Sequence, residues 1–197
     1  MRFISLPPFV LNYEDKRCTD WAHESNKALS KDVALYKDSV RYLATLPMKD
    51  MDGAIRELDS AINDSLCSGV EIATNIAGME LDDEYLAPFW KMADQNEVFV
   101  LLHPHYTIKS TRLERYHLRN LIGNPFDTTI AAFAIMTGDT INKHPGLKIC
   151  FSHSGGYTPY AIPRFEHART ARKAFREIPR IYGQCCKRFY YDTIIPV

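Results

Sequence analysis

The stretch that decides the fold is LKICFSHSGG, residues 147–156. Its apolar half does not alternate between apolar and polar side chains, which is typical of a parallel strand covered on both faces. We expect the strand to end at Ser152-His153, because the two glycines that follow allow the backbone to turn sharply. Parallel α/β enzymes hold their chemistry at the carboxyl ends of their strands. The stretch therefore predicts a buried parallel strand with His153 at its tip.

The same pattern occurs upstream in VFVLLHPH, residues 98–105. The apolar run stops at His103, and a proline follows. One strand-end histidine is more often satisfied by local backbone groups, but two in one parallel sheet would project into the same crevice. Imidazoles there bind a divalent metal or transfer protons near neutral pH. The pair therefore favours a functional site, whereas His105, two residues further on, is expected to be a loop residue.

Strand-like and helix-like segments alternate along the whole chain. Strands are predicted at residues 2–6, 42–46, 70–76, 98–102, 147–151 and 188–192. Between them, helices are predicted at 18–35, from Asp50 to about Leu66 with Gly69 as the stop, at 82–95, from Asp127 or Thr128 to about 143, and around 164–175. This order predicts an α/β fold with a parallel sheet, right-handed crossovers and one domain over residues 1–197.

Composition and charge exclude several classes of protein. Hydrophobic residues make up 46% of the chain, and 24 Lys and Arg balance 24 Asp and Glu, so no net field favours nucleic acid or a membrane surface. The apolar runs are far shorter than the roughly 20 residues of a membrane span. The first residues resemble no signal peptide. Five cysteines without a CxxC spacing predict reduced thiols in a cytoplasmic protein.

Longer motifs carry a resemblance to a known family. In order they are LATLPMKDMDGAIREL, GVEIATNIAGMELDDEYLAPFW, VLLHPH, NLIGNPFDTTIA, HPGLKICFSHSGGYTPYAIPRFEHA and FYYDT. Together they resemble the amidohydrolase-superfamily decarboxylases similar to aminocarboxymuconate semialdehyde decarboxylase. The resemblance implies a metal-dependent (β/α)₈ barrel with a divalent metal, usually zinc, at its carboxyl face. It also implies a small carboxylic acid substrate and a homo-oligomer.

The resemblance also assigns roles to individual residues. It makes His103 a metal-binding histidine. It makes His153 the catalytic histidine of an HxGG motif, close to a metal-bound water and active in proton transfer. Arg164 matches an arginine that, in dimers of the family, reaches into the neighbouring active site and holds a substrate carboxylate.

The chain departs from the family pattern at both ends. Its six strands match the second to seventh strands of the barrel, so we expect an incomplete (β/α)₈ barrel whose edge strands are open. The HxH pair of the family's first strand and the metal-binding aspartate of its eighth strand have no counterpart. Asp192 matches the seventh strand, where it either caps a turn or orients a ligand. One of four ligands cannot hold zinc as the family does.

Three functions follow from these observations. The first is a metal-dependent non-oxidative decarboxylase, a carbon–carbon lyase for an unsaturated or aromatic carboxylic acid, present as a fragment or an inactive remnant. The second is a metal-dependent hydrolase of a lactone or amide. The third is a non-catalytic remnant that binds a partner through its open barrel edges.

Overall fold

The computed structural model describes residues 1–6, 17–105, 107–108, 110–173 and 182–193. Within these residues one sheet is formed by six strands: β1 (Arg2–Ile4), β2 (Val40–Thr45), β3 (Cys67–Ala73), β4 (Phe99–His103), β5 (Lys148–Phe151) and β6 (Tyr190–Tyr191). Their order in the sheet is their order in the chain, and every neighbouring pair is parallel. The prediction of a parallel α/β sheet is confirmed.

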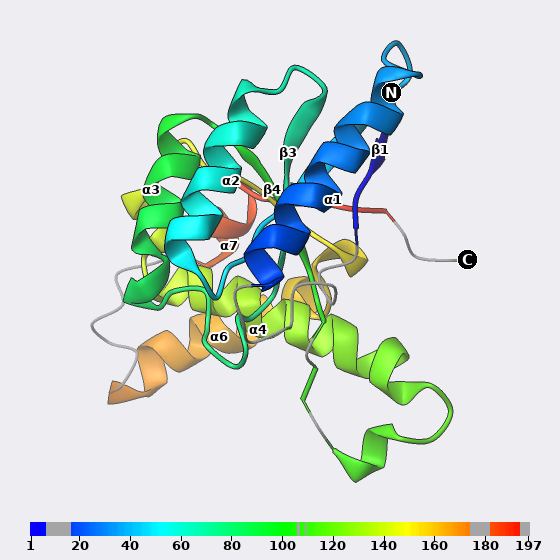
Figure 1. The fold of residues 1–197 in the computed structure, drawn as a ribbon. Coiled ribbons are helices and arrows are strands. Elements are labelled where there is room, and N and C mark those ends of the chain that lie inside the picture. The colour runs from blue at the N-terminus through cyan, green and yellow to red at the C-terminus, as the bar shows by residue number, and fades with distance from the viewer. Residues whose placement is uncertain (7–16, 106, 109, 174–181, 194–197) are drawn as a thin grey trace.

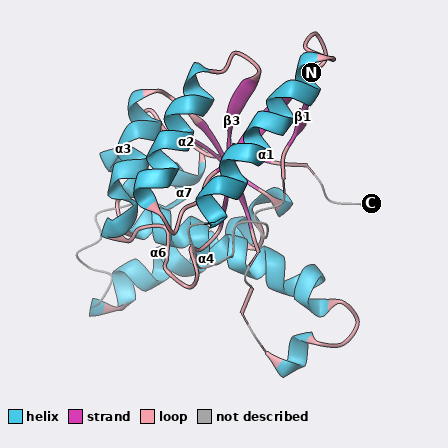
Figure 2. Ribbon diagram, viewed as in Figure 1, coloured by secondary structure: helices cyan, strands magenta, loops and turns pink. Residues whose placement is uncertain are grey.

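Helices lie in front of the sheet and below it in the view of Figure 2, and β1 forms an outer edge of the sheet. The helices are α1 (Arg17–Ala34), α2 (Met51–Asn63), α3 (Ala87–Gln95), α4 (Asn124–Thr137), α5 (Thr140–Lys143), α6 (Thr158–Ala171) and α7 (Tyr182–Cys186). Short helical turns occur at η2 (Glu84–Leu86), η3 (Thr111–Leu113), η4 (Arg119–Gly123) and η5 (His153–Gly155). Figure 1 shows α1, α2 and α3 side by side against the sheet, with α4 and α6 below them. None of the described helices is both long and apolar enough to cross a membrane.

The hydrophobic core lies between one face of the sheet and the helices. Alternate strand residues point into it, including Val70, Val100 and Ile149, which are partners in register and fully buried. Leu58 of α2 and Phe89 of α3 pack against the same core. Because each strand exposes alternate residues on opposite faces, the remaining strand residues line the inner face of the curled sheet. The strand residues that pack in the core therefore determine which of their neighbours face the inside of the curled sheet.

The end of α2 differs from the sequence prediction. The helix stops at Asn63, where the backbone N–H of Asp64 donates to the Ala61 carbonyl. Gly69 lies inside β3 with φ +148°, and a Cβ there would lie 2.2 Å from the Phe99 carbonyl oxygen. The prediction of Gly69 as the helix stop is therefore wrong, because the glycine serves close strand–strand approach and not a helix cap.

The helix predicted from Asp127 or Thr128 starts earlier and is interrupted. It begins at Asn124 as a continuation of η4, with Pro125 in its first turn, so neither predicted cap residue is the cap. It stops at Gly138, and Asp139 then takes a left-handed conformation with φ 74° before α5. The predicted polar excursion after β4 contains η3 and η4, and it protrudes from the body of the molecule (Figure 1).

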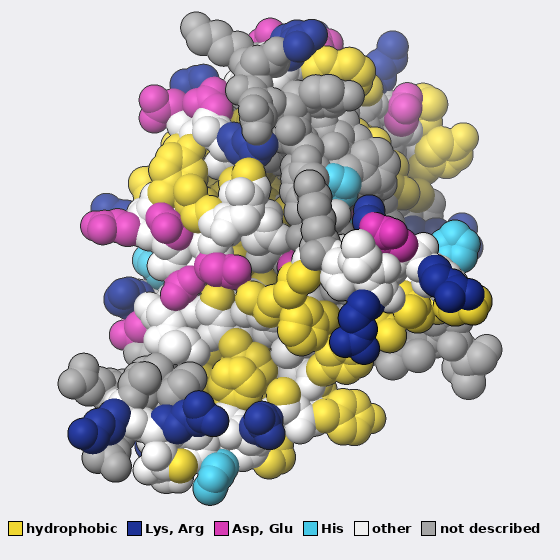
Figure 3. Space-filling model, turned by 90° about the horizontal axis from the view of Figure 1, so that it is seen from below, with side chains coloured by type: hydrophobic (Ala, Val, Ile, Leu, Met, Phe, Trp, Pro, Cys, Tyr) yellow, Lys and Arg dark blue, Asp and Glu magenta, His cyan; other side chains and the backbone are white. Residues whose placement is uncertain are grey.

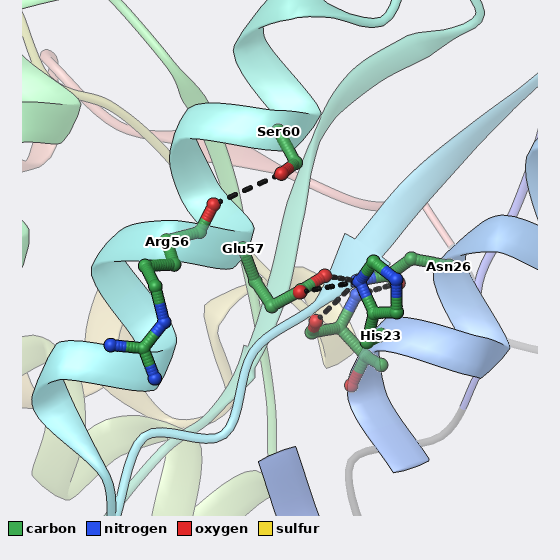
Figure 4. Close-up of polar contacts among 6 residues, drawn as sticks. His23, Asn26, Arg56, Glu57 and Ser60 are labelled. Carbon is green, nitrogen blue, oxygen red and sulfur yellow. Dashed lines mark hydrogen bonds and ion pairs between the residues drawn. The ribbon is translucent and has the colours of Figure 1, made fainter. Parts of the chain in front are cut away.

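The edge strands are shorter than predicted. β1 has three residues, all exposed, and it pairs with β2 only as far as Tyr42. Beyond that point Asn26 of α1 replaces a strand partner, because its side chain bonds both the Thr45 N–H and the Thr45 carbonyl at 2.9 Å. Glu57 of α2 accepts from Asn26 at 3.2 Å and contacts His23 at 2.9 Å (Figure 4). This network joins α1, α2 and β2.

Candidate active site

The carboxyl ends of β4 and β5 meet at one point of the sheet rim. Leu102 is the register partner of Phe151, so His103 and Ser152 leave their strands side by side. The imidazole centroids of His103 and His153 lie 5.3 Å apart, with the ring planes at 49°. The structure therefore brings together the two histidines that the sequence singled out.

His103 presents a nitrogen atom suited to a ligand. Its ring is half-buried, and its Nδ1 atom is buried without a hydrogen-bond partner of acceptable geometry. Burial lowers the pKa of His103, and the neighbouring His153 lowers it further, while the backbone of Pro104 and the negative charge of Asp192 oppose both effects. A neutral imidazole with a free ring nitrogen is the form that binds a divalent metal.

His153 stands on a tight left-handed turn that follows β5. Its own φ is 54° and that of Ser154 is 51°, values that non-glycine residues adopt rarely. The Ser152 hydroxyl lies 3.0 Å from His153 Nδ1, and this hydrogen bond holds the orientation of the ring. Burial lowers the pKa of His153, and the charge of Asp192 opposes that shift. The opposite edge of the ring is therefore the one left for chemistry.

The second glycine of the motif explains why the chain can turn here. Gly156 has φ 62°, and a Cβ on it would lie 2.0 Å from the Pro125 carbonyl oxygen at the start of α4. The next amide, that of Tyr157, donates to the Thr129 hydroxyl at 2.8 Å. The turn is therefore packed directly against α4, and only a glycine fits at this position.

Asp192 follows β6 and bonds to the same turn. Its Oδ1 atom accepts from the Ser154 N–H at 2.9 Å, and its carbonyl oxygen accepts from the Ser154 hydroxyl at 3.0 Å. Its own N–H donates to the Phe151 carbonyl at 3.1 Å. Of the two sequence interpretations of Asp192, these contacts favour the turn-capping one.

The metal site is incomplete within this part of the chain. Over the described residues, no group of three or more His, Cys, Asp and Glu side chains could hold a metal ion. The unpaired Nδ1 of His103 fits one ligand position, but a protein zinc site takes three or four protein ligands. His105 lies just beyond the strand, and its pKa is lowered first by burial and then by His103. Among the described residues of this site, His103 is thus a single candidate ligand.

Arg164 is exposed on α6. It lines a groove of about 570 Å³ together with Phe165, His167, Ala168, Ala171 and Arg172. Figure 3 shows Lys and Arg side chains gathered at this end of the lower face, beside patches of exposed hydrophobic side chains. Neither His103 nor His153 is among the residues that line this groove.

A polar cluster that the sequence did not indicate lies at the end of β3. Asp127 is buried and accepts hydrogen bonds from the Thr74 hydroxyl and, at 3.2 Å, from Asn75 Nδ2. Burial raises the pKa of Asp127, and these two hydrogen bonds partly offset the rise. The cluster ties the β3 tip to the start of α4. An aspartate in a first helical turn gave only a capping signal, so the buried contact could not be found from the sequence.

The sequence matches the model of a known protein family. The family model described as Amidohydrolase matches residues 9–192. The chain is 29% identical over 202 residues to the 2-amino-3-carboxymuconate-6-semialdehyde decarboxylase of Dictyostelium discoideum, an alignment that covers 99% of this chain and 55% of that protein. The chain therefore spans about half the length of this curated relative.

Solved structures support the fold. The apo crystal structure of Metarhizium anisopliae IDCase superposes with a TM-score of 0.90 at 24% identity, covering 98% of this chain and 55% of that one. A dihydroxybenzoic acid decarboxylase from Polaromonas sp. JS666, solved with bound manganese and the inhibitor 2-nitroresorcinol, gives a TM-score of 0.80 at 24% identity and covers 94% of this chain and 60% of that one. The prediction of an incomplete barrel of the metal-dependent hydrolase type is confirmed.

Proposed function

This chain belongs to the amidohydrolase family, and from that membership we propose that it forms part of a metal-dependent non-oxidative decarboxylase acting on an aromatic or unsaturated carboxylic acid. The observation that carries the proposal is the pair of strand-end imidazoles, 5.3 Å apart, one of which has a buried nitrogen without a partner. Relatives and solved structures that are named decarboxylases support the same chemistry.

We assign His103 as one metal ligand and His153 as the proton-transfer residue. In the reaction the bond between the carboxylate and its carbon breaks and carbon dioxide leaves. The electron pair left on carbon takes a proton from the protonated form of His153, which then regains a proton from solvent. A divalent metal, manganese or zinc, supplies charge stabilisation for the acid's oxygen atoms when bound. Because the described residues supply one ligand, the remaining ligands come from polypeptide outside them.

We assign Arg164 to the carboxylate of a substrate bound in a second copy of the chain. An exposed arginine in a groove that contains neither histidine suits a contact across subunits, since arginine binds carboxylates with two parallel hydrogen bonds. Exposed apolar side chains on the neighbouring elements, among them Leu121, Phe126 and Tyr160, support a homo-oligomer. The five free cysteines support a cytoplasmic location.

The test measures metal content and product together. The chain is prepared together with the polypeptide that supplies the missing ligands, loaded with Mn²⁺ or Zn²⁺, analysed by elemental mass spectrometry, and incubated with a dihydroxybenzoic acid while carbon dioxide release is followed. The proposal expects stoichiometric metal and carbon dioxide, with activity lowered about 100-fold or more by His153→Ala. The matched control is His117→Ala, which alters an exposed histidine of the protruding segment.

Two results separate the other functions from this one. Release of a ring-opened acid from a lactone, without carbon dioxide, would show a hydrolase. A well-folded oligomer that binds no metal and converts no acid would show a non-catalytic protein that uses its open barrel edges to bind a partner.

A further inference from the structure

We propose that Asp192 is a positioning residue that holds the left-handed turn after β5 and thereby aims His153 at His103. The inference rests on the proposed function, in which His153 moves the proton. It concerns a residue of the seventh family strand, outside the metal ligands and outside the groups that touch substrate. The support comes from the backbone of the turn and from three hydrogen bonds.

The turn requires outside support. His153 and Ser154 are adjacent, and both have positive φ values, 54° and 51°. For residues with a Cβ this conformation is disfavoured and persists only where the surrounding structure holds it. The side chain direction of His153 depends directly on its own φ and on the peptide that joins it to Ser154. Whatever holds Ser154 therefore also sets the direction of the imidazole.

Asp192 supplies that support from a neighbouring strand. Its carboxylate accepts from the Ser154 N–H, and its carbonyl accepts from the Ser154 hydroxyl, so Ser154 is held at both its backbone and its side chain. The N–H of Asp192 donates to the Phe151 carbonyl at the end of β5, which fixes Asp192 itself in register with the strand that leads into the turn. The three bonds close a ring of contacts around the base of His153.

Asp192 could act on the histidines in a second way, through its charge, which favours protonation of both His103 and His153. The two actions can be separated. Asn in place of Asp192 keeps an oxygen that accepts from the Ser154 N–H but removes the charge. Ala removes both. Gly in place of Ser154 relieves the cost of the left-handed conformation, so the turn needs its anchor less.

The experiment reads the distance between the two rings. The whole chain is prepared with ring-¹³C histidine, and the nuclear Overhauser effect between the His103 and His153 ring protons is measured in the unaltered chain, D192N, D192A and the double variant D192A/S154G. Because this effect falls with the sixth power of distance, a shift of the ring lowers it several-fold. We expect D192N to keep the signal, D192A to lose it several-fold, and the double variant to recover most of it.

Each outcome bears on the proposal. Loss of the signal in folded D192N, or failure of S154G to restore it in the D192A background, would overturn the positioning role and assign the effect of Asp192 to its charge. Full signal in D192A would overturn it as well. If D192A does not fold, as judged by circular dichroism, the double variant decides the question: folding with the signal kept supports the anchoring role, and folding without the signal overturns it. The measurement needs neither metal nor turnover, so it stands apart from any failure of the proposed decarboxylase activity.

Discussion

Replacing Asn26 with alanine should destabilise the protein strongly, although the residue is not part of the histidine pair. Its side chain satisfies the N–H and the carbonyl of Thr45 at a point where β1 no longer covers β2, and all three groups are buried (Figure 4). Leaving one buried polar group unsatisfied costs about 1–3 kcal/mol, so two such groups cost about 4 kcal/mol. A protein has about 5–15 kcal/mol of stability in all.

Urea unfolding followed by circular dichroism measures this loss. We expect the midpoint to fall with an unchanged slope, and the melting temperature to fall by roughly 10 °C. Asn63→Ala is the matched control, because Asn63 also bonds a backbone carbonyl, that of Asp59 at 2.8 Å, but does so on an exposed helix. The control should change stability by about 0.5 kcal/mol or less. If N26A were as stable as N63A, the strand-mimicking role of Asn26 would be refuted.

Two further changes test the inner face and the turn. Burial raises the pKa of Glu71 from 4.5 to about 7; the folded state therefore binds more protons between these values, and stability should fall by about 3 kcal/mol as pH rises through that window. Glu71→Gln should remove this dependence of the unfolding free energy on pH, as measured by urea unfolding at several pH values. An unchanged dependence would contradict the raised pKa of Glu71. Gly156→Ala should lower stability by more than about 2 kcal/mol, because it combines left-handed strain with a clash against Pro125. Gly78 has φ 89° and open space around it, so Gly78→Ala should lower stability by about 1 kcal/mol. Thermal melts measure both losses. Equal losses in the two glycine variants would show that strain alone matters.

The sequence was most informative where burial dictates the pattern. Unbroken apolar runs located β2, β4 and β5, since strands covered on both faces lose their alternation. They also placed His103 and His153 at neighbouring strand ends. The distance between the rings could not be predicted, because it depends on the left-handed turn at His153 and Ser154, which no local propensity indicates.

Other features depended on contacts between distant segments. Gly69 looked like a helix stop because a glycine after an amphipathic run usually is one, yet it serves the approach of Phe99 from the next strand. Asn26 looked like an ordinary helix residue, and only the short reach of β1 gives it a backbone to bond. In both cases the deciding partner lies about 20–30 residues away in the sequence.

The strand order has a consequence for how the protein is made. Each strand pairs with the strand that precedes it in the chain, so a newly synthesised strand finds its neighbour already emerged from the ribosome. No strand in the described sheet has to wait for a later one before it can add to the growing edge. The described sheet can therefore assemble vectorially, from β1 onward, with β6 as the last described strand to dock and the His153 turn completed only when Asp192 arrives.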